Sequence, residues 1–258
     1  EMDWLEHSRR FVEGLGLVWN PLTTQIESHD FIAELFAILI RIDTILLGFS
    51  RDMWSYLGIE YFTQRVVKGE TGSSTMPHKV NPIDFENCEG NLGIATALFE
   101  HLATKLPVSR WQRDLTDSTA LRSIGAAFGH LVVALGSLQR GLARVVVNHR
   151  LIAADLEREE AWEVVAEAIQ TLMRRHGLPK PYETLKELTR GQPIDRKTMQ
   201  KFIATLELPE SARRALHKLA PRSYVGLAAE LVDRFAPRAN QSDAAPRRSK
   251  AVNNRRAL

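Results

Sequence analysis

The stretch DFIAELFAILIRIDTILLGFSRDMWSYLG, residues 30–58, decides the fold. Its apolar side chains recur at steps of three and four residues, which predicts a helix that starts at Ser28 or Asp30 and runs to about Gly58. Further isoleucine and leucine side chains widen the apolar surface well beyond one stripe. A helix this apolar packs against other helices on most sides, from its own chain or from a partner subunit.

Two more long helices are predicted downstream. One runs from Asp84 to about Lys105, and the other runs from Ser118 to roughly Val147 with Asp117 as its cap. The chain also opens inside a helical pattern that begins at Trp4, without a capping signal ahead of it. Three long helices with wide apolar faces predict an elongated bundle with coiled-coil-like packing.

The texture of the chain changes beyond Asn148, where short amphipathic helices are broken by glycine and proline. We expect a partial helical-bundle domain over residues 1–148 and a small C-terminal helical domain over 149–235. Residues 236–258 carry six basic side chains against one acidic, which predicts a disordered basic tail. No alternating pattern longer than four residues occurs, so the fold class is all-α.

Composition excludes several classes of protein. The single cysteine, Cys88, rules out an intrachain disulfide framework and fits a reducing, cytoplasmic compartment. No uncharged apolar run reaches the roughly 20 residues of a membrane span, and the first residues lack the pattern of a signal peptide. The eight histidines are scattered and no pair has metal-ligand spacing with an acidic partner, so we expect no metal. We also expect no cofactor. The basic tail has no aromatic residue to stack on a base, which argues against a nucleic-acid partner.

A polar loop over residues 69–82, GETGSSTMPHKVNP, precedes the second long helix. Asn81 is suited to cap that helix, Pro82 to fill its first position, and Asp84 and Glu86 to complement its dipole. Two serines and a lysine just ahead of a helix start would also suit an anion. Local chemistry alone leaves an ordinary capped connection as the simpler interpretation.

A second cluster of basic and hydroxyl side chains surrounds the start of the third helix. Ser118 and Arg122 are four residues apart on one helical face, and Arg113 lies in the preceding loop. Two guanidinium groups beside helix-start amides suit a phosphate monoester. The alternative is that these arginines simply pair with Asp114 and Asp117, and the two interpretations are equally compatible with the sequence.

Residues 72–82, GSSTMPHKVNP, resemble the Gly-Ser-Ser-x-Met-Pro-x-Lys-x-Asn-Pro signature of the fumarase/aspartase superfamily at every fixed position. The segments 23–27 (TTQIE), 84–87 (DFEN) and 105–119 (KLPVSRWQRDLTDST) are similar to the adenylosuccinate lyase family within it. The likeness covers about residues 1–235 and leaves the basic tail outside.

The resemblance implies an anti β-elimination that releases fumarate from adenylosuccinate, giving AMP, and from the succinyl-carboxamide ribotide of purine biosynthesis. By position in the signature, Ser73 is the catalytic base, and Lys79 and the adjacent helix N-terminus favour its alkoxide and the charge that builds on the carboxylate. Positions that match substrate contacts of the family are Gln25, Ser74, Lys79, Val80, Asn81 and Asn87, together with Arg113, Ser118 and Arg122 for the phosphate and Thr119, Ala120 and Leu121 in the same segment.

The resemblance also implies that part of the site lies outside these 258 residues. Family members carry an N-terminal domain ahead of the equivalent of Glu1, and it supplies the histidine general acid. Their sites are assembled from several subunits of a homotetramer. We therefore expect the C-terminal portion of such a lyase. Alternatives are a non-catalytic helical module that pairs with a full-length lyase, and a lyase for another substrate such as argininosuccinate, against which the arginine cluster argues.

Overall fold

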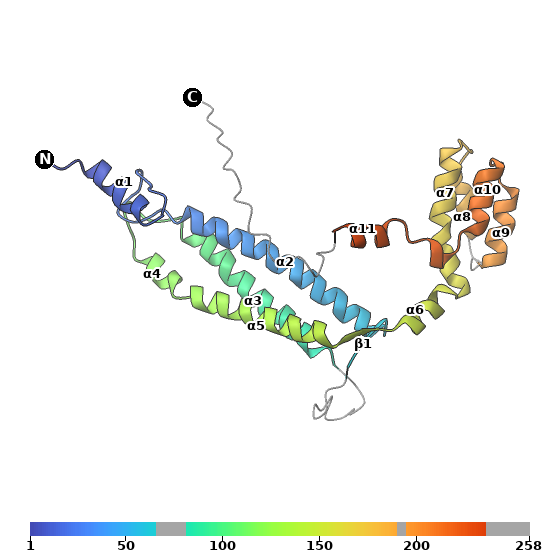
Figure 1. Ribbon diagram of the computed structural model, residues 1–258, viewed down its shortest axis with the longest axis horizontal. Helices are drawn as coiled ribbons and strands as arrows, with labels where there is room; N and C mark the ends of the chain where they lie inside the picture. The colour runs from blue at the N-terminus through green and yellow to red at the C-terminus, as the bar shows by residue number, and fades with distance from the viewer. Residues whose placement is uncertain (66–80, 190–194, 236–258) are drawn as a thin grey trace. The chain divides into compact units, whose positions relative to one another are not determined.

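The computed structural model describes residues 1–65, 81–189 and 195–235 (Figure 1). Its chain divides into two compact units, Glu1–Ile152 and a second that begins at Ala153. Helices dominate both units within the described residues, so the all-α prediction is confirmed. The division falls four residues beyond the boundary that the change in sequence texture indicates, and each unit is described by itself below.

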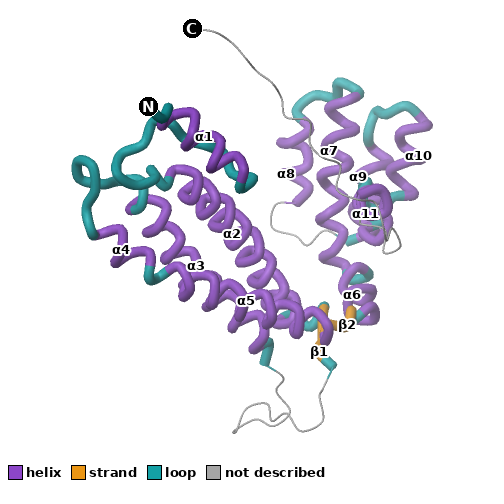
Figure 2. The backbone as a smooth tube through the Cα atoms, turned by 60° about the vertical axis from the view of Figure 1, so that its left-hand side comes forward, coloured by secondary structure: helices purple, strands orange, loops and turns teal. Residues whose placement is uncertain are grey.

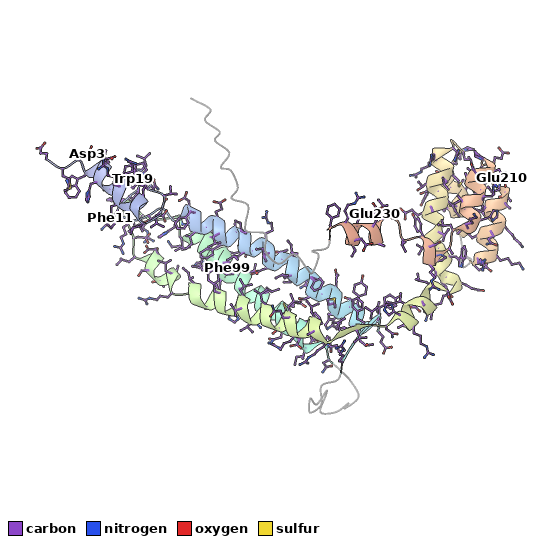
Figure 3. The ribbon with its side chains drawn as sticks, viewed as in Figure 1. Asp3, Phe11, Trp19, Phe99, Glu210 and Glu230 are labelled. Carbon is purple, nitrogen blue, oxygen red and sulfur yellow. The ribbon has the colours of Figure 1, made fainter. Side chains whose placement is uncertain are left out.

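Helix α1 spans Trp4–Gly14, and Asp3 is its N-cap residue. The Asp3 carboxylate accepts hydrogen bonds from the amides of Leu5 and Glu6 at 3.0 and 3.1 Å (Figure 3 labels Asp3). Asp3 and Glu6 have the spacing of a capping box, so the expectation of no capping signal before Trp4 was wrong.

The first unit is built on three long helices, α2 (Asp30–Gly58), α3 (Ile83–Lys105) and α5 (Ile124–Arg144). Helix α3 packs along its length against both α2 and α5 (Figures 1 and 2). The bundle and the bounds of α2 follow the predicted three- and four-residue periodicity.

An aromatic cluster forms the centre of this bundle. The rings of Phe36 on α2 and Phe99 on α3 stack with centroids 5.3 Å apart, and Phe128 on α5 meets Phe99 edge-on at 5.2 Å (Figure 3 labels Phe99). Phe36 and Phe99 are fully buried. One residue from each helix therefore joins the three at a common core, which burial of aromatic surface stabilises.

Polar pairs between helices fix their directions. Arg51 and Trp54 on α2 bond to Glu89 and Glu86 on α3, so that later residues of α2 meet earlier residues of α3. Asp84 and Asn87 on α3 likewise bond to Arg140 and Ser137 on α5. Both neighbours of α3 therefore run antiparallel to it, and the start of α3 lies level with the end of α2 and the end of α5.

The third long helix differs from its prediction at both ends. A separate short helix α4 covers Thr116–Leu121, a turn at Arg122 and Ser123 follows, and α5 ends at Arg144. Residues Val145–Val147 form strand β2, which pairs antiparallel with β1 (Phe62–Gln64). Three consecutive β-branched residues favour extended backbone, and strands of three residues are too short to show an alternating pattern.

The start of α3 also differs from its prediction. Asn81 does not cap the helix, because Pro82 occupies the N-cap position and the helix begins at Ile83. The Pro82 carbonyl accepts hydrogen bonds from the amides of Phe85 and Glu86 at 3.0 and 3.2 Å. The N-cap is thus one residue later than the predicted Asn81, and the first helical residue lies between the predicted positions Pro82 and Asp84, a shift typical of predicted helix ends.

The second unit is a compact set of short helices around one apolar core. Helix α6 (His149–Leu156) spans the boundary between the units. The helices that follow are η1 (Glu159–Val164), α7 (Val165–Arg175), α8 (Pro181–Thr189), α9 (Arg196–Thr205), α10 (Glu210–Lys218), η2 (Pro221–Ser223) and α11 (Ala228–Phe235). Their core contains Ile169, Met173, Met199, Ile203 and Leu216.

One helical stretch of the described residues, Thr116–Arg144, is long and apolar enough to cross a membrane by length and composition. Core helices of soluble proteins meet the same criterion. This stretch is interrupted at Arg122 and Ser123, and its α5 part packs along α3 with Ser137 and Arg140 in polar contacts. Its apolar character is accounted for by a place in the bundle.

Candidate functional site

The described residues on either side of segment 66–80 lie at one end of the bundle. Arg65, its last described neighbour, donates its amide to the Arg144 carbonyl at 2.9 Å. On the other side, Asn81 leads directly into α3, whose start lies beside the last turns of α5. The predicted base Ser73 and the predicted contacts Ser74, Lys79 and Val80 lie outside the described residues.

A buried ion-pair cluster anchors the start of α3. Asp84 is 7% exposed, and its carboxylate lies 3.2 Å from Nε of Arg140 and 3.5 Å from Nη1 of Arg144. Gly141, between the two arginines, lets α5 approach closely, since a Cβ there would lie 3.0 Å from the Phe85 ring. Both described flanks of the 66–80 segment are thereby held against the last turns of α5.

Sequence reasoning gave Asp84 only a dipole role and missed its two arginine partners. A signal was present, because Asp84, Cys88 and Leu92 recur every four residues on the buried face of α3. A carboxylate on such a face requires a partner. What the sequence lacked was the antiparallel register that brings Arg140 and Arg144 to it.

Asn87, a predicted substrate contact, lies in the second turn of α3 at this same end. Its side-chain amide donates to the hydroxyl of the buried Ser137 at 3.0 Å, and Ser137 also accepts from Nη2 of Arg140 at 2.9 Å. Asn91, one turn later, donates its own side-chain amide to Oδ1 of Asn87 at 2.9 Å. Asn81, the other described contact predicted here, is half-buried immediately before the helix.

The arginine cluster lies at the opposite end of the bundle. Arg113 precedes α4, Ser118 is within it, and Arg122 follows it; both arginines are exposed. Neither guanidinium pairs with Asp114 or Asp117 in the described part of the chain, so the alternative interpretation of these arginines is not supported. The other members of the predicted binding segment are the exposed Thr119, the buried Ala120 and the half-buried Leu121.

The two nearby aspartates instead hold the backbone ahead of and within α4. Asp114 accepts from the amides of Arg110 and Thr116 and from the Thr116 hydroxyl, and this hydroxyl bond is the main reason that its pKa falls to about 2. Asp117 accepts from the amide of Ser118 at 2.7 Å. Two early amides of α4 therefore already have carboxylate partners, and an anion here would be held chiefly by side chains.

Gln25, the remaining predicted contact, lies in the connection between α1 and α2 and is exposed. The hydroxyls of Thr23 and Thr24 both donate to the Ile26 carbonyl, at 2.9 and 3.2 Å, and so shape the backbone on either side of Gln25. This connection leads into the start of α2, which lies at the same end of the bundle as the end of α3 and the start of α5.

Those predicted site residues that the structure describes thus fall into two groups that one copy of the chain does not bring together. Asn81 and Asn87 lie at the β1–β2 end, whereas Gln25, Arg113 and the segment 118–122 lie at the α4 end (Figure 1). Asn87 is level with Ser137 of α5, and α5 begins at Ile124, so the axial separation is roughly 20 Å at 1.5 Å per residue. Among the described residues, no three potential metal ligands gather in either group.

Comparison with known proteins identifies relatives over most of the chain. Residues 3–96 match the family described as Lyase, and residues 109–225 match the family described as Adenylosuccinate lyase C-terminal. The chain is 54% identical over 235 residues to adenylosuccinate lyase of Vibrio cholerae, which is 91% of this chain and 51% of that protein. It is 53% identical over 233 residues to the Escherichia coli K12 protein of the same name, which is 90% of this chain and 51% of that protein.

A eukaryotic relative is similar to the same degree. Adenylosuccinate lyase of Dictyostelium discoideum is 52% identical over 231 residues, which is 88% of this chain and 49% of that protein. The chain therefore spans about half the length of the curated relatives that it matches.

Proposed function

This chain belongs to the adenylosuccinate lyase family, and on that premise we propose that it supplies the base and the phosphate-binding residues of an adenylosuccinate lyase site. The reaction is the elimination of fumarate from adenylosuccinate to give AMP, and from the succinyl-carboxamide ribotide to give the carboxamide ribotide. The observation that carries this proposal is the complete catalytic signature at residues 72–82 within a chain 54% identical to a named lyase.

In this proposal Ser73 removes the proton β to the leaving nitrogen. The electron pair of that C–H bond forms the fumarate double bond as the C–N bond breaks, and a general acid protonates the departing nitrogen. Lys79 and Asn81 stabilise the negative charge that builds on the neighbouring carboxylate of the succinyl group. The acid is expected from the part of the relatives that this chain does not span.

The phosphate of the substrate is held by Arg113, Ser118 and Arg122. Support comes from the two guanidinium groups, which are exposed and have no carboxylate partner among the described residues. Arginine binds phosphate through paired N–H donors, so two free guanidinium groups around a hydroxyl suit a phosphate monoester. This chemistry favours a nucleotide substrate over argininosuccinate.

A working site would contain residues from more than one copy. The separation of roughly 20 Å between Asn87 and the α4 end supports a site shared across an oligomer, because neither group can reach the other within one bundle. We propose a homotetramer, as the resemblance to the family implies, acting in the cytoplasm.

The test is fumarate release, followed by the ultraviolet absorbance of adenylosuccinate. The 258-residue chain alone is expected to turn over little, because in this proposal the general acid comes from the part of the relatives that the chain does not span. Mixed with a polypeptide covering the unmatched half of the Vibrio cholerae relative, it is expected to release fumarate. Ser73→Ala should then lower kcat by about 10²–10⁴-fold. Ser8→Ala, a serine within α1, is the matched control and should retain the rate of the unmodified chain.

Each remaining result bears on one part of the proposal. Full turnover by the chain alone would contradict the proposal that the general acid comes from outside this chain. A stable mixed oligomer without fumarate release would support a non-catalytic assembly module instead. Failure both to assemble and to release fumarate would contradict the proposed function.

A further inference from the structure

The Asn87 carboxamide is held in one orientation although the residue itself is exposed. Its Nδ2 donates to Oγ of Ser137 at 3.0 Å, and its Oδ1 accepts from Nδ2 of Asn91 at 2.9 Å. Both ends of the amide are thus engaged, one by α5 and one by its own helix. Rotation by 180° would put Oδ1 against Ser137 and Nδ2 against the Asn91 donor, which breaks the second bond.

The orientation of Asn91 is fixed independently. Its Nδ2 also donates to the carbonyl of Asn87 at 2.8 Å, and its Oδ1 lies 2.8 Å from Nδ1 of His130 on α5. An amide oxygen can only accept, so the neutral His130 ring carries its proton on Nδ1 when this bond forms. Asn91 therefore presents a donor, and not an acceptor, to Asn87.

Ser137 is equally constrained, because it is fully buried between α3 and α5. Its hydroxyl oxygen accepts from both Asn87 and Nη2 of Arg140, and Arg140 is in turn bound to the buried Asp84. The chain of contacts from Asp84 to Ser137 leaves the hydroxyl oxygen facing Asn87.

We propose that Asn91 and Ser137 are positioning residues that turn a free N–H of Asn87 toward the substrate. Among the described residues, one Nδ2 hydrogen of Asn87 has no partner, and it suits an oxygen of an anionic ligand such as a succinyl carboxylate. A flipped carboxamide would present its oxygen to that anion and repel it. The inference rests on the proposed function, since it assigns Asn91 and Ser137 to the same site.

The experiment measures KM for adenylosuccinate in the mixed assembly that releases fumarate. Asn91→Ala and Ser137→Ala are each expected to raise KM about fivefold or more with little change in kcat, because a ground-state contact is weakened. A purely structural role would instead lower the amount of active assembly, and therefore the apparent kcat, while KM stayed constant. Both substitutions leave the net charge unchanged, so they do not alter the field around an anionic substrate.

A double-substitution cycle tests whether Asn91 acts through Asn87. Asn87→Ala with Asn91→Ala should show the KM of Asn87→Ala alone, since there is no carboxamide left to orient. The proposal would be overturned if Asn91→Ala raised KM by the same factor in the unmodified chain and in the Asn87→Ala variant. An unchanged KM in both Asn91→Ala and Ser137→Ala would overturn it as well.

Amide hydrogen exchange of the Asn87 side chain, followed by NMR in the unmixed chain, examines the same geometry without substrate. Protection that is lost in Ser137→Ala supports the fixed carboxamide, and exchange that is equally fast in both chains overturns it. If the mixed assembly of the unmodified chain releases no fumarate, the proposed function is contradicted. The NMR measurement on the unmixed chain still tests the carboxamide geometry in that case.

Discussion

At the scale of single residues, Asp43 presents a carboxyl group buried in an apolar bundle. Its side chain is fully buried, its Oδ2 accepts a long 3.4 Å bond from Thr96, and its Oδ1 has no partner. Burial raises the pKa of Asp43 above its ordinary value, and the Thr96 hydroxyl only partly opposes this. The folded protein therefore holds the proton more tightly than the unfolded chain does.

The sign of the pH dependence follows from this raised pKa. The Asp43 contribution to stability falls as pH rises from the ordinary aspartate pKa, about 3.9, through the higher value in the folded state. Asp43→Asn keeps the shape without the charge, so it should stabilise the protein at neutral pH by on the order of 1–3 kcal/mol. That gain should shrink toward pH 4, as measured by urea unfolding across the pH range.

Asp52→Asn is the matched control for Asp43→Asn, because Asp52 is an exposed aspartate on the same helix. Its unfolding midpoint should change little. A loss of stability in Asp43→Asn at neutral pH would show that the carboxylate is ionised and satisfied in the folded state.

At the scale of helices, the contact of α3 with α5 depends on Gly141. A Cβ at that position would lie 3.0 Å from the ring of Phe85 and 3.2 Å from Cβ of Asp84, and Phe85 is only 1% exposed. We expect Gly141→Ala to lower the free energy of unfolding by about 1–2 kcal/mol. Overpacking costs roughly 1–3 kcal/mol, and the higher helix propensity of alanine returns up to about 1 kcal/mol.

Gly129→Ala on the same helix provides the comparison, because a Cβ there would meet no atom within 4 Å. It should raise stability by about 0.5–1 kcal/mol through helix propensity alone. If urea unfolding showed an equal rise in the free energy of unfolding for both substitutions, the close contact of Gly141 with Phe85 and Asp84 would be contradicted.

Much of this helical arrangement could be predicted from local sequence, and the exceptions have a common physical cause. The three- and four-residue steps of α2 predict both of its ends, since periodicity is a property of the segment itself. The break at Arg122 and Ser123, the strand Val145–Val147 and the partners of Asp84 depend instead on which residues the fold brings together. Periodicity carries no information about register between helices, so those features had to come from the structure.

The arrangement of the candidate site depends on contacts between helices in the same way. Resemblance named Asn87 and Arg113 residue by residue and implied a site shared between subunits, but it did not say which of these residues one bundle holds at opposite ends. The orienting residues Asn91 and Ser137 belong to no local motif, because their roles arise from contact across α3 and α5.

At the scale of the whole molecule, α2 carries an apolar stripe that the described residues leave exposed. Six side chains at steps of three and four residues are each at least 40% exposed: Phe31, Leu35, Ile38, Ile42, Ile45 and Phe49. A stripe with this spacing is the pattern by which helices pack against partner helices. Together with the separation of the two site groups, it predicts that the chain self-associates through α2.

Introducing charge into this stripe should therefore dissociate the oligomer. Ile42→Glu combined with Ile45→Glu should shift the mass measured by light scattering toward that of the 29.1 kDa monomer, because burying unpaired charges in a helix interface is costly. Thr44→Glu is the matched control: Thr44 is exposed on another face of the same helix, and its substitution should leave the oligomer intact. A monomer in the unmodified chain would contradict self-association, and an oligomer unaffected by the two charges would place the interface elsewhere. If the oligomer dissociates, fumarate release in the mixed assembly should fall with it, because each site would lose the residues that a second copy contributes.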